Sequence, residues 1–129
     1  MAQYADIVEI VAPAQAPAGS RVDITVKVKN TYSSPIGIKV VGVPEYAGLP
    51  PGIYIDFPVE SANVNPGETF SFYGSFTMPD KTVTVHAYSY WYGADGSWYF
   101  DDEMTKLVGV SAAPQPSISD FRIADYIKV

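Results

Sequence analysis

The run Arg21-Val-Asp-Ile-Thr-Val-Lys-Val-Lys29 alternates apolar and polar side chains without a break. Because successive side chains of a strand point to opposite faces, this alternation predicts an antiparallel strand with one face in a core and one in water. A second clean alternation lies at residues 69–78, where inward-facing side chains surround Gly74: Phe70, Phe72, Phe76 and Met78. Glycine at an inward position indicates a bulge or a close approach by the opposing sheet.

Five further runs are β-prone, and turn-forming residues separate them. These runs are Ala5–Val11, Ile36–Val43, Ile53–Val59, Val83–Tyr92 and Trp98–Val110. The eleven prolines lie almost entirely in the connections, where they remove no ladder hydrogen bonds. No segment of helical length has a 3.6-residue period. The pattern predicts an all-β fold, an immunoglobulin-like antiparallel β-sandwich of about seven strands with a C-terminal extension strand.

Composition limits the class of function. The 129 residues fit one domain, and 47% hydrophobic residues with only 17% charged residues indicate a packed core rather than disorder. The net charge of −6 disfavours nucleic acid as a partner, because phosphate binding depends on Lys and Arg. The absence of cysteine excludes a disulfide framework and a thiolate zinc site. No apolar run approaches the ~18 residues of a membrane span.

Aromatic residues crowd the segment His86–Glu103, which reads HAYSYWYGADGSWYFDDE. Seven of the chain's eighteen aromatic residues lie in it, on both sides of the turn 93–96. The dipeptide Asp95-Gly96 between two β-prone runs predicts a hairpin, because glycine accepts the positive φ of a tight turn. Aromatic side chains at nearly every position cannot all enter one core. Some of them are therefore expected on an outer face or at an interface.

The two faces of the hairpin follow from the alternation of side chains. Trp91 shares a face with the apolar residues of its strand, so a core position is expected. The opposite face carries His86 and three phenols: Tyr88, Tyr90 and Tyr92. Across the turn, Trp98 and Phe100 share one face and Tyr99 takes the other.

Three interpretations of the outward aromatic residues are open. They stabilise the hairpin as cross-strand pairs, each contributing roughly 0.2–1 kcal/mol. They form a protein–protein interface, where Tyr and Trp combine a large apolar area with a polar tip. They form a carbohydrate platform, where flat rings stack on sugar faces. The candidate binding residues are Tyr88, Tyr90, Tyr92, Trp98 and Tyr99, with Tyr46 and Leu49 from the proline-stiffened loop 43–54. For Leu49 a purely structural role, capping the end of the sandwich, is equally open.

The sequence offers little for catalysis. His86 is the single histidine, on a predicted strand, and no Gly-x-Ser-x-Gly elbow or phosphate-binding loop accompanies it. We therefore predict no enzyme activity, no catalytic residue and no cofactor. Weak candidates for calcium ligands are Asp95, Asp101, Asp102 and Glu103. They lack the spacing of a calcium loop, and Asp101 and Asp102 point to opposite faces unless the strand breaks, so solvated acids are the preferred interpretation.

Two motifs of the chain are similar to those of one family. Residues 18–31, AGSRVDITVKVKNT, combine a small residue and glycine, an alternating strand and Asn-Thr; residues 64–69 and 76–80 read VNPGET and FTMPD. Together they resemble the opening and middle of CARDB-type bacterial immunoglobulin-like domains, over residues 5–110. The resemblance implies an adhesion or spacer module of a surface or virion protein. The chain departs from it at Asp101-Asp102-Glu103, where the family ends in Asn-Glu.

The carboxy-terminal residues divide into two parts. Residues 111–117, SAAPQPS, predict a linker, because paired prolines with small residues favour extended conformations. Residues 118–129 are β-prone, and three roles are open for them: closing the chain's own sheet, pairing with a neighbouring subunit's edge, or beginning a second domain. We therefore divide the chain into a sandwich at 1–110, a linker at 111–117 and an extension at 118–129.

These observations predict a non-catalytic structural or assembly module of a surface or virion-type protein. Its expected partners are other protein subunits or copies of itself, contacted through the aromatic hairpin and the C-terminal strand. The alternative is a small carbohydrate-binding module that stacks sugars on Tyr and Trp rings. An extracellular surface or a virion is favoured over the cytoplasm as its location.

Overall fold

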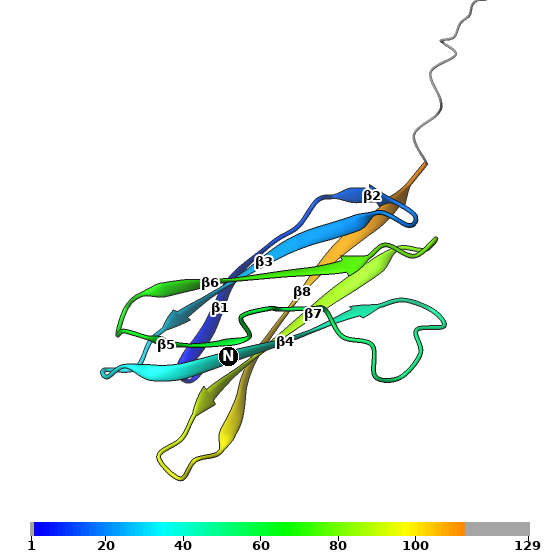
Figure 1. Ribbon diagram of the computed structural model, residues 1–129. Helices are drawn as coiled ribbons and strands as arrows, with labels where there is room; N and C mark the ends of the chain where they lie inside the picture. The colour runs from blue at the N-terminus through cyan, green and yellow to red at the C-terminus, as the bar shows by residue number, and fades with distance from the viewer. Residues whose placement is uncertain (1, 113–129) are drawn as a thin grey trace, which may run out of the picture.

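Residues 2–112 are described by a computed structural model, in which two β-sheets pack face to face (Figure 1). One sheet has the strand order β1-β3-β6, and the other has the order β2-β8-β7-β4-β5. The described residues contain no helix, so none of them forms a helix that could cross a membrane. The strands are β1 (Ala5–Val11), β2 (Gln15–Pro17), β3 (Arg21–Asn30), β4 (Ile36–Glu45), β5 (Ser61–Val64), β6 (Thr69–Thr77), β7 (Val83–Tyr92) and β8 (Trp98–Ser111). The predicted all-β sandwich is confirmed.

Most of the predicted strands are present, and two short strands, β2 and β5, were not predicted. Strands β1 and β7 have the predicted ends, and the ends of β3, β4, β6 and β8 move by at most two residues. The three residues of β2 pair in parallel with β8 at Gly109–Ser111. A run of three residues is too short to show a period. Of the predicted linker, Ser111 belongs to β8, and residues 113–129 lie outside the described part of the chain.

The predicted strand at Ile53–Val59 is wrong, because the segment binds both sheets instead of joining one. The Ile55 amide donates to the carbonyl of Gly42 on β4, whereas Asp56 forms an isolated antiparallel bridge with Ser75 on β6. The alternation of buried and exposed side chains in this segment is nevertheless present, since Ile55 and Phe57 are buried. The fifth strand is instead the four-residue β5, which pairs with the first residues of β4.

This segment explains two strand glycines. A Cβ atom on Gly74 would lie 2.7 Å from the Phe57 ring, and one on Gly42 would lie 2.9 Å from the same ring. The close approach predicted at Gly74 is therefore confirmed, although the neighbour is the segment 53–59 rather than a strand of the opposing sheet. Ile55 and Phe57 fill the space between the sheets at this edge, and the two glycines make room for them.

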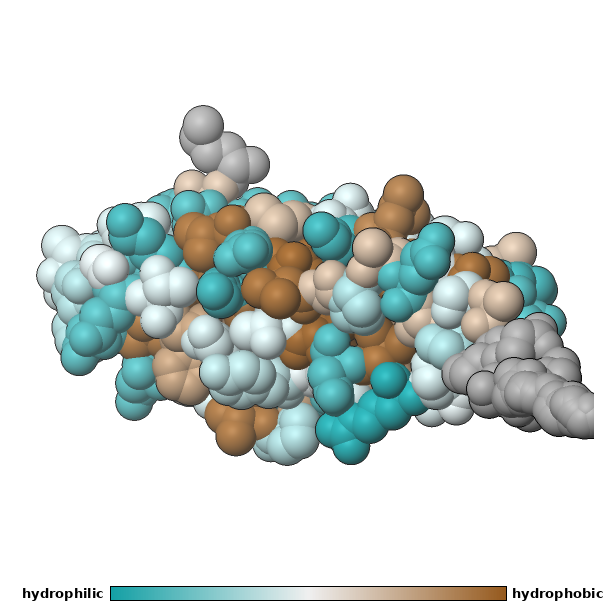
Figure 2. Space-filling model, turned by 90° about the horizontal axis from the view of Figure 1, so that it is seen from above, coloured by the Kyte–Doolittle hydropathy of each residue, from teal (hydrophilic) through white to brown (hydrophobic). Residues whose placement is uncertain are grey.

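The core lies between the sheets and is almost entirely aliphatic and aromatic. The inward side chains of β3 are Val22, Ile24, Val26 and Val28, all of them buried as predicted. The buried amide of Asn30 donates to the Val64 and Ser34 carbonyls and accepts a hydrogen bond from the Tyr32 backbone amide, so this polar side chain is satisfied. Figure 2 views the molecule from above, where hydrophobic residues are interspersed with hydrophilic ones.

Candidate functional site

The aromatic hairpin forms as predicted. Strands β7 and β8 pair antiparallel along their length, and the Gly93 amide closes the turn by donating to the Ser97 carbonyl. Gly96 has a φ of 83°, the conformation for which glycine is needed. Trp91 packs partly buried against the core, as its alternation predicts. The hairpin projects from one end of the sandwich (Figure 1).

The outward side chains of the hairpin form an aromatic surface on the five-stranded sheet. We call it the outer aromatic face, made of Tyr88, Tyr90, Tyr92, Trp98 and Phe100. The Phe100 ring centroid lies 5.8 Å from that of Tyr90 and 6.1 Å from that of Tyr88, and Tyr92 contacts Trp98 edge-on at 4.9 Å. Phe100 is 56% exposed. The structure therefore brings together four of the seven predicted binding residues.

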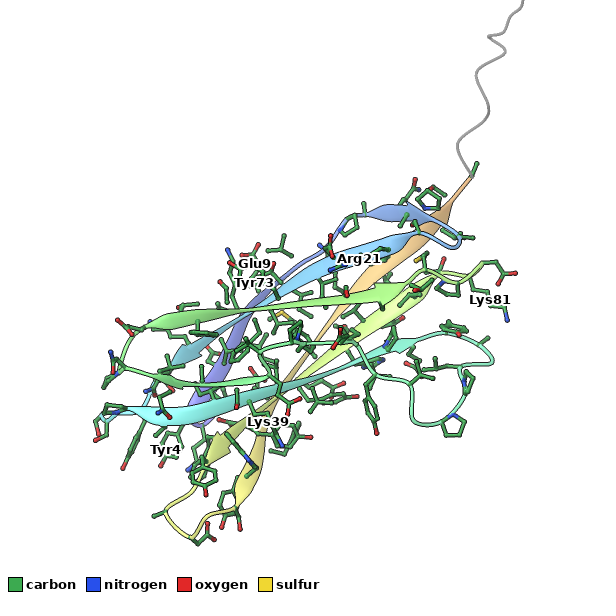
Figure 3. All side chains as sticks on the ribbon, viewed as in Figure 1. Tyr4, Glu9, Arg21, Lys39, Tyr73 and Lys81 are labelled. Carbon is green, nitrogen blue, oxygen red and sulfur yellow. The ribbon has the colours of Figure 1, made fainter. Side chains whose placement is uncertain are left out.

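A cation joins this surface from the neighbouring strand. Lys39 extends from β4 close to the hairpin (Figure 3). Its Nζ atom lies 5.0 Å from the ring centroid of Tyr90 and 5.1 Å from that of Trp98. Both distances are within the range of cation–π attraction. The sequence alone did not indicate Lys39, because its pairing partner Tyr90 lies 51 residues further along the chain.

Tyr99 lies on the other side of the hairpin, in a second aromatic cluster. Its ring stacks on Trp91 at 4.8 Å, and the Tyr4 ring contacts Trp91 at 4.9 Å and Tyr32 at 4.6 Å. These four rings line a pocket of about 630 Å³ between the β3–β4 turn and the hairpin turn. We call it the aromatic pocket. Sequence analysis missed Tyr4 and Tyr32, since only the tertiary fold places them beside the hairpin.

Tyr46 and Leu49 do not join the hairpin residues. They follow the carboxyl end of β4, whereas the hairpin lies beside the opposite end of that strand. Tyr46 is half-buried and packs against the core, and Leu49 is also half-buried in a turn closed by its own amide and the Tyr46 carbonyl. Their placement favours the structural role that the sequence left open.

The acidic residues of β8 are not simply solvated. The pairing register of β7 and β8 shifts between Ser89 and Tyr90, so that an additional residue of β8 is accommodated there. This bulge directs both Asp101 and Asp102 toward β1, because it interrupts the alternation that would otherwise separate them. Sequence analysis allowed for their convergence only if the strand broke, and the bulge is that break.

The two carboxylates bind the backbone of β1. Asp101 accepts hydrogen bonds from the amides of Gln3, Tyr4 and Ala5 at 2.5–2.7 Å, and Asp102 accepts one from Ile7 at 3.0 Å. The buried Ser89 hydroxyl donates to the Ala5 carbonyl at 2.5 Å. Side chains of the five-stranded sheet thus satisfy the edge of β1 that faces away from β3. An edge satisfied in this way offers less of a template for pairing with another chain.

The acids proposed as metal ligands are separated by this arrangement. Asp95 lies in the hairpin turn and accepts hydrogen bonds from the Tyr99 hydroxyl and the Ser97 amide, which lower its pKa. Glu103 binds His86, on the outer side of the sheet. Among residues 2–112 no group of three or more His, Cys, Asp or Glu side chains is placed to hold a metal ion.

His86 lies between two carboxylates. Its Nδ1 atom is 3.0 Å from Glu103 on β8, and its Nε2 atom is 2.5 Å from Glu45 on β4. Burial lowers the pKa of the imidazole, but the hydrogen bonds to Glu103 and Glu45 outweigh it and raise the pKa above the ordinary value. Both ring nitrogens are thus engaged by carboxylates. His86 ties three neighbouring strands together across the outer face.

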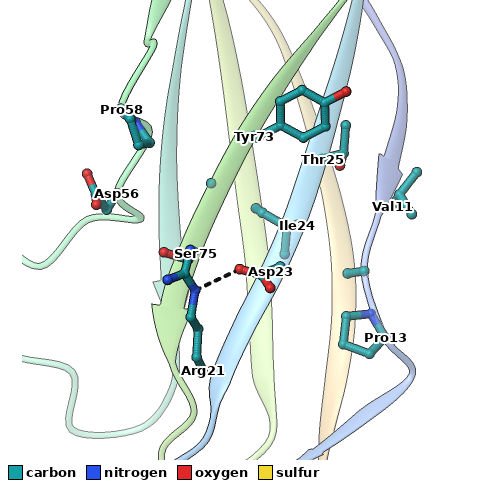
Figure 4. A pocket seen from close by; sticks show the side chains of 12 residues that line it. Val11, Pro13, Arg21, Asp23, Ile24, Thr25, Asp56, Pro58, Tyr73 and Ser75 are labelled. Atoms are coloured by element: carbon teal, nitrogen blue, oxygen red, sulfur yellow. Dashed lines mark hydrogen bonds and ion pairs between the residues drawn. The ribbon is translucent and has the colours of Figure 1, made fainter.

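A separate hollow of about 520 Å³ lies over the outer face of the three-stranded sheet (Figure 4). The exposed ion pair of Arg21 and Asp23 and the ring of Tyr73 line it. None of the predicted binding residues is among its lining residues.

Comparisons with known proteins match the fold alone. Neither the protein-family models nor the curated protein sequences contain a match to the chain. The PKD domain of an M14-like peptidase from Thermoplasmatales archaeon SCGC AB-540-F20 is similar with a TM-score of 0.55 and 16% identity, over 85% of this chain and 98% of that one. An alpha-2-macroglobulin from E. coli is similar with a TM-score of 0.58 and 15% identity, over 81% of this chain and 6% of that one.

A third similar structure is a chain of the complex between Zinc 2-glycoprotein and Prolactin inducible protein from human seminal plasma. Its TM-score is 0.52 and its identity 12%, over 81% of this chain and 96% of that one. The neighbours include a PKD domain and other β-sandwiches, and they establish an immunoglobulin-like β-sandwich. They do not specifically match the CARDB type.

Proposed function

We propose that this chain is a non-catalytic protein-binding domain that joins other protein subunits, copies of itself among them, into a surface or virion-type assembly. The observation that carries the proposal is the outer aromatic face, two groups of ring side chains on one side of a sheet with Lys39 beside a ring of each. Rings that serve only to stabilise a hairpin do not need to be exposed, yet Phe100 and Tyr92 are 56% and 46% exposed.

The chemistry of this face favours a protein partner over a sugar. Phe100 is the most exposed ring of this face and has no polar tip, and Leu107, also exposed, lies further along the outer side of β8. Cores of protein interfaces are enriched in such residues and depleted in charge. Sugar platforms need polar groups around the ring to bind hydroxyls.

The carboxy-terminal residues suit a head-to-tail assembly. Strand β8 ends at Ser111, at the end of the sandwich opposite the hairpin turn. The last strand of the sandwich therefore ends away from the outer aromatic face. A β-prone segment in that position is suited to pair with a strand edge of the next subunit. The CARDB-type resemblance of residues 5–110 supports the same role as an adhesion or spacer module.

A matched pair of substitutions tests the proposal. Phe100→Ser removes the most exposed ring of the outer aromatic face, and Tyr73→Ser removes a 68% exposed ring of the other sheet. We expect the oligomeric mass in solution to fall in Phe100→Ser and to be unchanged in Tyr73→Ser. Deleting residues 118–129 should also lower the oligomeric order. An unchanged mass after the deletion would remove the C-terminal strand from the proposal.

A carbohydrate-binding module is the second candidate, because of Lys39. Its ammonium group beside Tyr90 and Trp98 supplies a hydrogen-bond donor next to stacking rings. This candidate predicts that a polysaccharide gel of glucan, chitin or mannan retards the chain and that Trp98→Ala abolishes the retardation. No retardation by any of the three would eliminate it.

A further inference from the structure

The aromatic pocket adjoins the outer aromatic face at Tyr92, which lines both, but its other lining rings are different and it has its own chemistry. Tyr4 precedes β1, Tyr32 lies in the turn between β3 and β4, and Trp91 and Tyr99 come from the hairpin. Three segments distant in sequence thus contribute these four rings, two of which come from the hairpin. The pocket stays open because Gly37 and Gly93 line it without side chains. A Cβ atom on Gly93 would lie 2.5 Å from the Tyr99 ring.

One charged side chain accompanies this wall. Asp95 is the only ionisable acid or base, apart from the phenols, among the described residues that line the pocket. The Tyr99 hydroxyl and the Ser97 amide donate to its carboxylate and lower its pKa, so it is ionised at neutral pH. None of the ion pairs in the described part of the chain involves it.

We propose that the aromatic pocket binds a lysine or arginine side chain presented by a partner protein. The faces of Tyr and Trp rings attract ammonium and guanidinium groups, and a neighbouring carboxylate adds to this attraction. The net charge of −6 steers cations toward the chain. A volume of about 630 Å³ is far larger than a charged head group and leaves room for the peptide backbone that carries it.

The binding is tested with capped amino acids on the full chain, independently of any assembly. The probes are N-acetyl-lysine-N-methylamide, its arginine counterpart, and N-acetyl-norleucine-N-methylamide as the uncharged counterpart. Residue-resolved NMR titration follows the Trp91 indole and the amides of residues 93–97. We expect both cationic probes to shift these signals, with the same dissociation constant at every signal for a given probe. The norleucine probe should leave the signals unchanged.

Two matched pairs of variants locate the site. Asp95→Asn should weaken binding about threefold to fivefold, whereas Asp80→Asn, which removes the same charge from an exposed residue elsewhere, should not change it. Tyr32→Ala should weaken binding, whereas Tyr73→Ala on the other sheet should not. Tyr32 and Asp95 lie in exposed turns, so both variants are expected to fold, and their unperturbed NMR spectra check this.

Several results would overturn the proposal. Equal shifts with the norleucine probe would mean that charge is not recognised. Equal effects of Asp95→Asn and Asp80→Asn would mean that only the net charge matters. Shifts with choline but with neither amino-acid probe would identify a free small cation, and shifts with glucose oligomers alone would identify a sugar site. If neither cationic probe shifts the NMR signals of the pocket, the proposal is also refuted.

Discussion

Gly74 is a residue at which the packing of the core leaves no space for a side chain. The missing side chain leaves space for Phe57 and Ile55, which would lie 2.7 Å and 3.0 Å from a new Cβ atom. Gly74→Ala should therefore lower the free energy of unfolding by about 1–3 kcal/mol, the usual cost of overpacking a core. Chemical denaturation measures this. Gly109→Ala is the control, because its Cβ atom would meet only ordinary contacts at 3.5 Å. Equal losses in the two variants would contradict the account.

His86 makes the stability of the protein depend on pH. The hydrogen bonds to Glu103 and Glu45 raise its folded pKa above the unfolded value of 6.5, despite the opposing effect of burial. A raised pKa means that the folded state holds the proton more tightly. The stabilisation of the folded state by protonated His86 is fully present below pH 6.5 and is lost as the pH rises through the folded pKa.

The variant His86→Gln isolates this contribution. Denaturation between pH 5.5 and pH 9 should show the wild-type chain losing stability relative to His86→Gln as the pH rises. A stability difference that is constant across this range would show that the imidazole makes no pH-dependent contribution.

At the scale of the elements, β1 depends on side chains of the opposite sheet. Asp101 and Asp102 bind four backbone amides at or before β1, and the bulge in β8 places them there. Replacing both with Asn should increase hydrogen exchange at Ala5 and Ile7, because an amide oxygen is a weaker acceptor than a carboxylate. The amides of β3 that pair with β6 should stay protected. Uniformly faster exchange in every strand would argue against a local role.

The elements also show what could be predicted from sequence. Alternation alone located β1, β3, β6 and β7 within one residue, because one face of each is buried and the other is wet. The same alternation at residues 53–59 led to a wrong prediction of a strand. Ile55 and Phe57 are buried because the segment lies over the core, although it does not pair with a strand of either sheet along its length. The cation at Lys39 and the rings of Tyr4 and Tyr32 beside the hairpin depend on contacts across 50 or more residues, and the bulge at Asp101 faces a strand more than 90 residues earlier in the chain. No local pattern carries that information.

At the scale of the whole molecule, the two sides of the hairpin differ in what they offer. The outer side presents a broad aromatic face with exposed Phe100, suited to another protein surface. The inner side presents a pocket with one carboxylate, suited to a single basic side chain. In the proposed function, the sandwich thus holds two contact sites at one end.

Absolute mass by light scattering, coupled to size exclusion over a wide concentration range, tests the central claim most directly. The account predicts a mass above the 14.0 kDa of one chain that increases with concentration, that falls toward one chain in Phe100→Ser, and that is retained in Tyr73→Ser. A mass of one chain at every concentration would contradict self-assembly through the outer aromatic face.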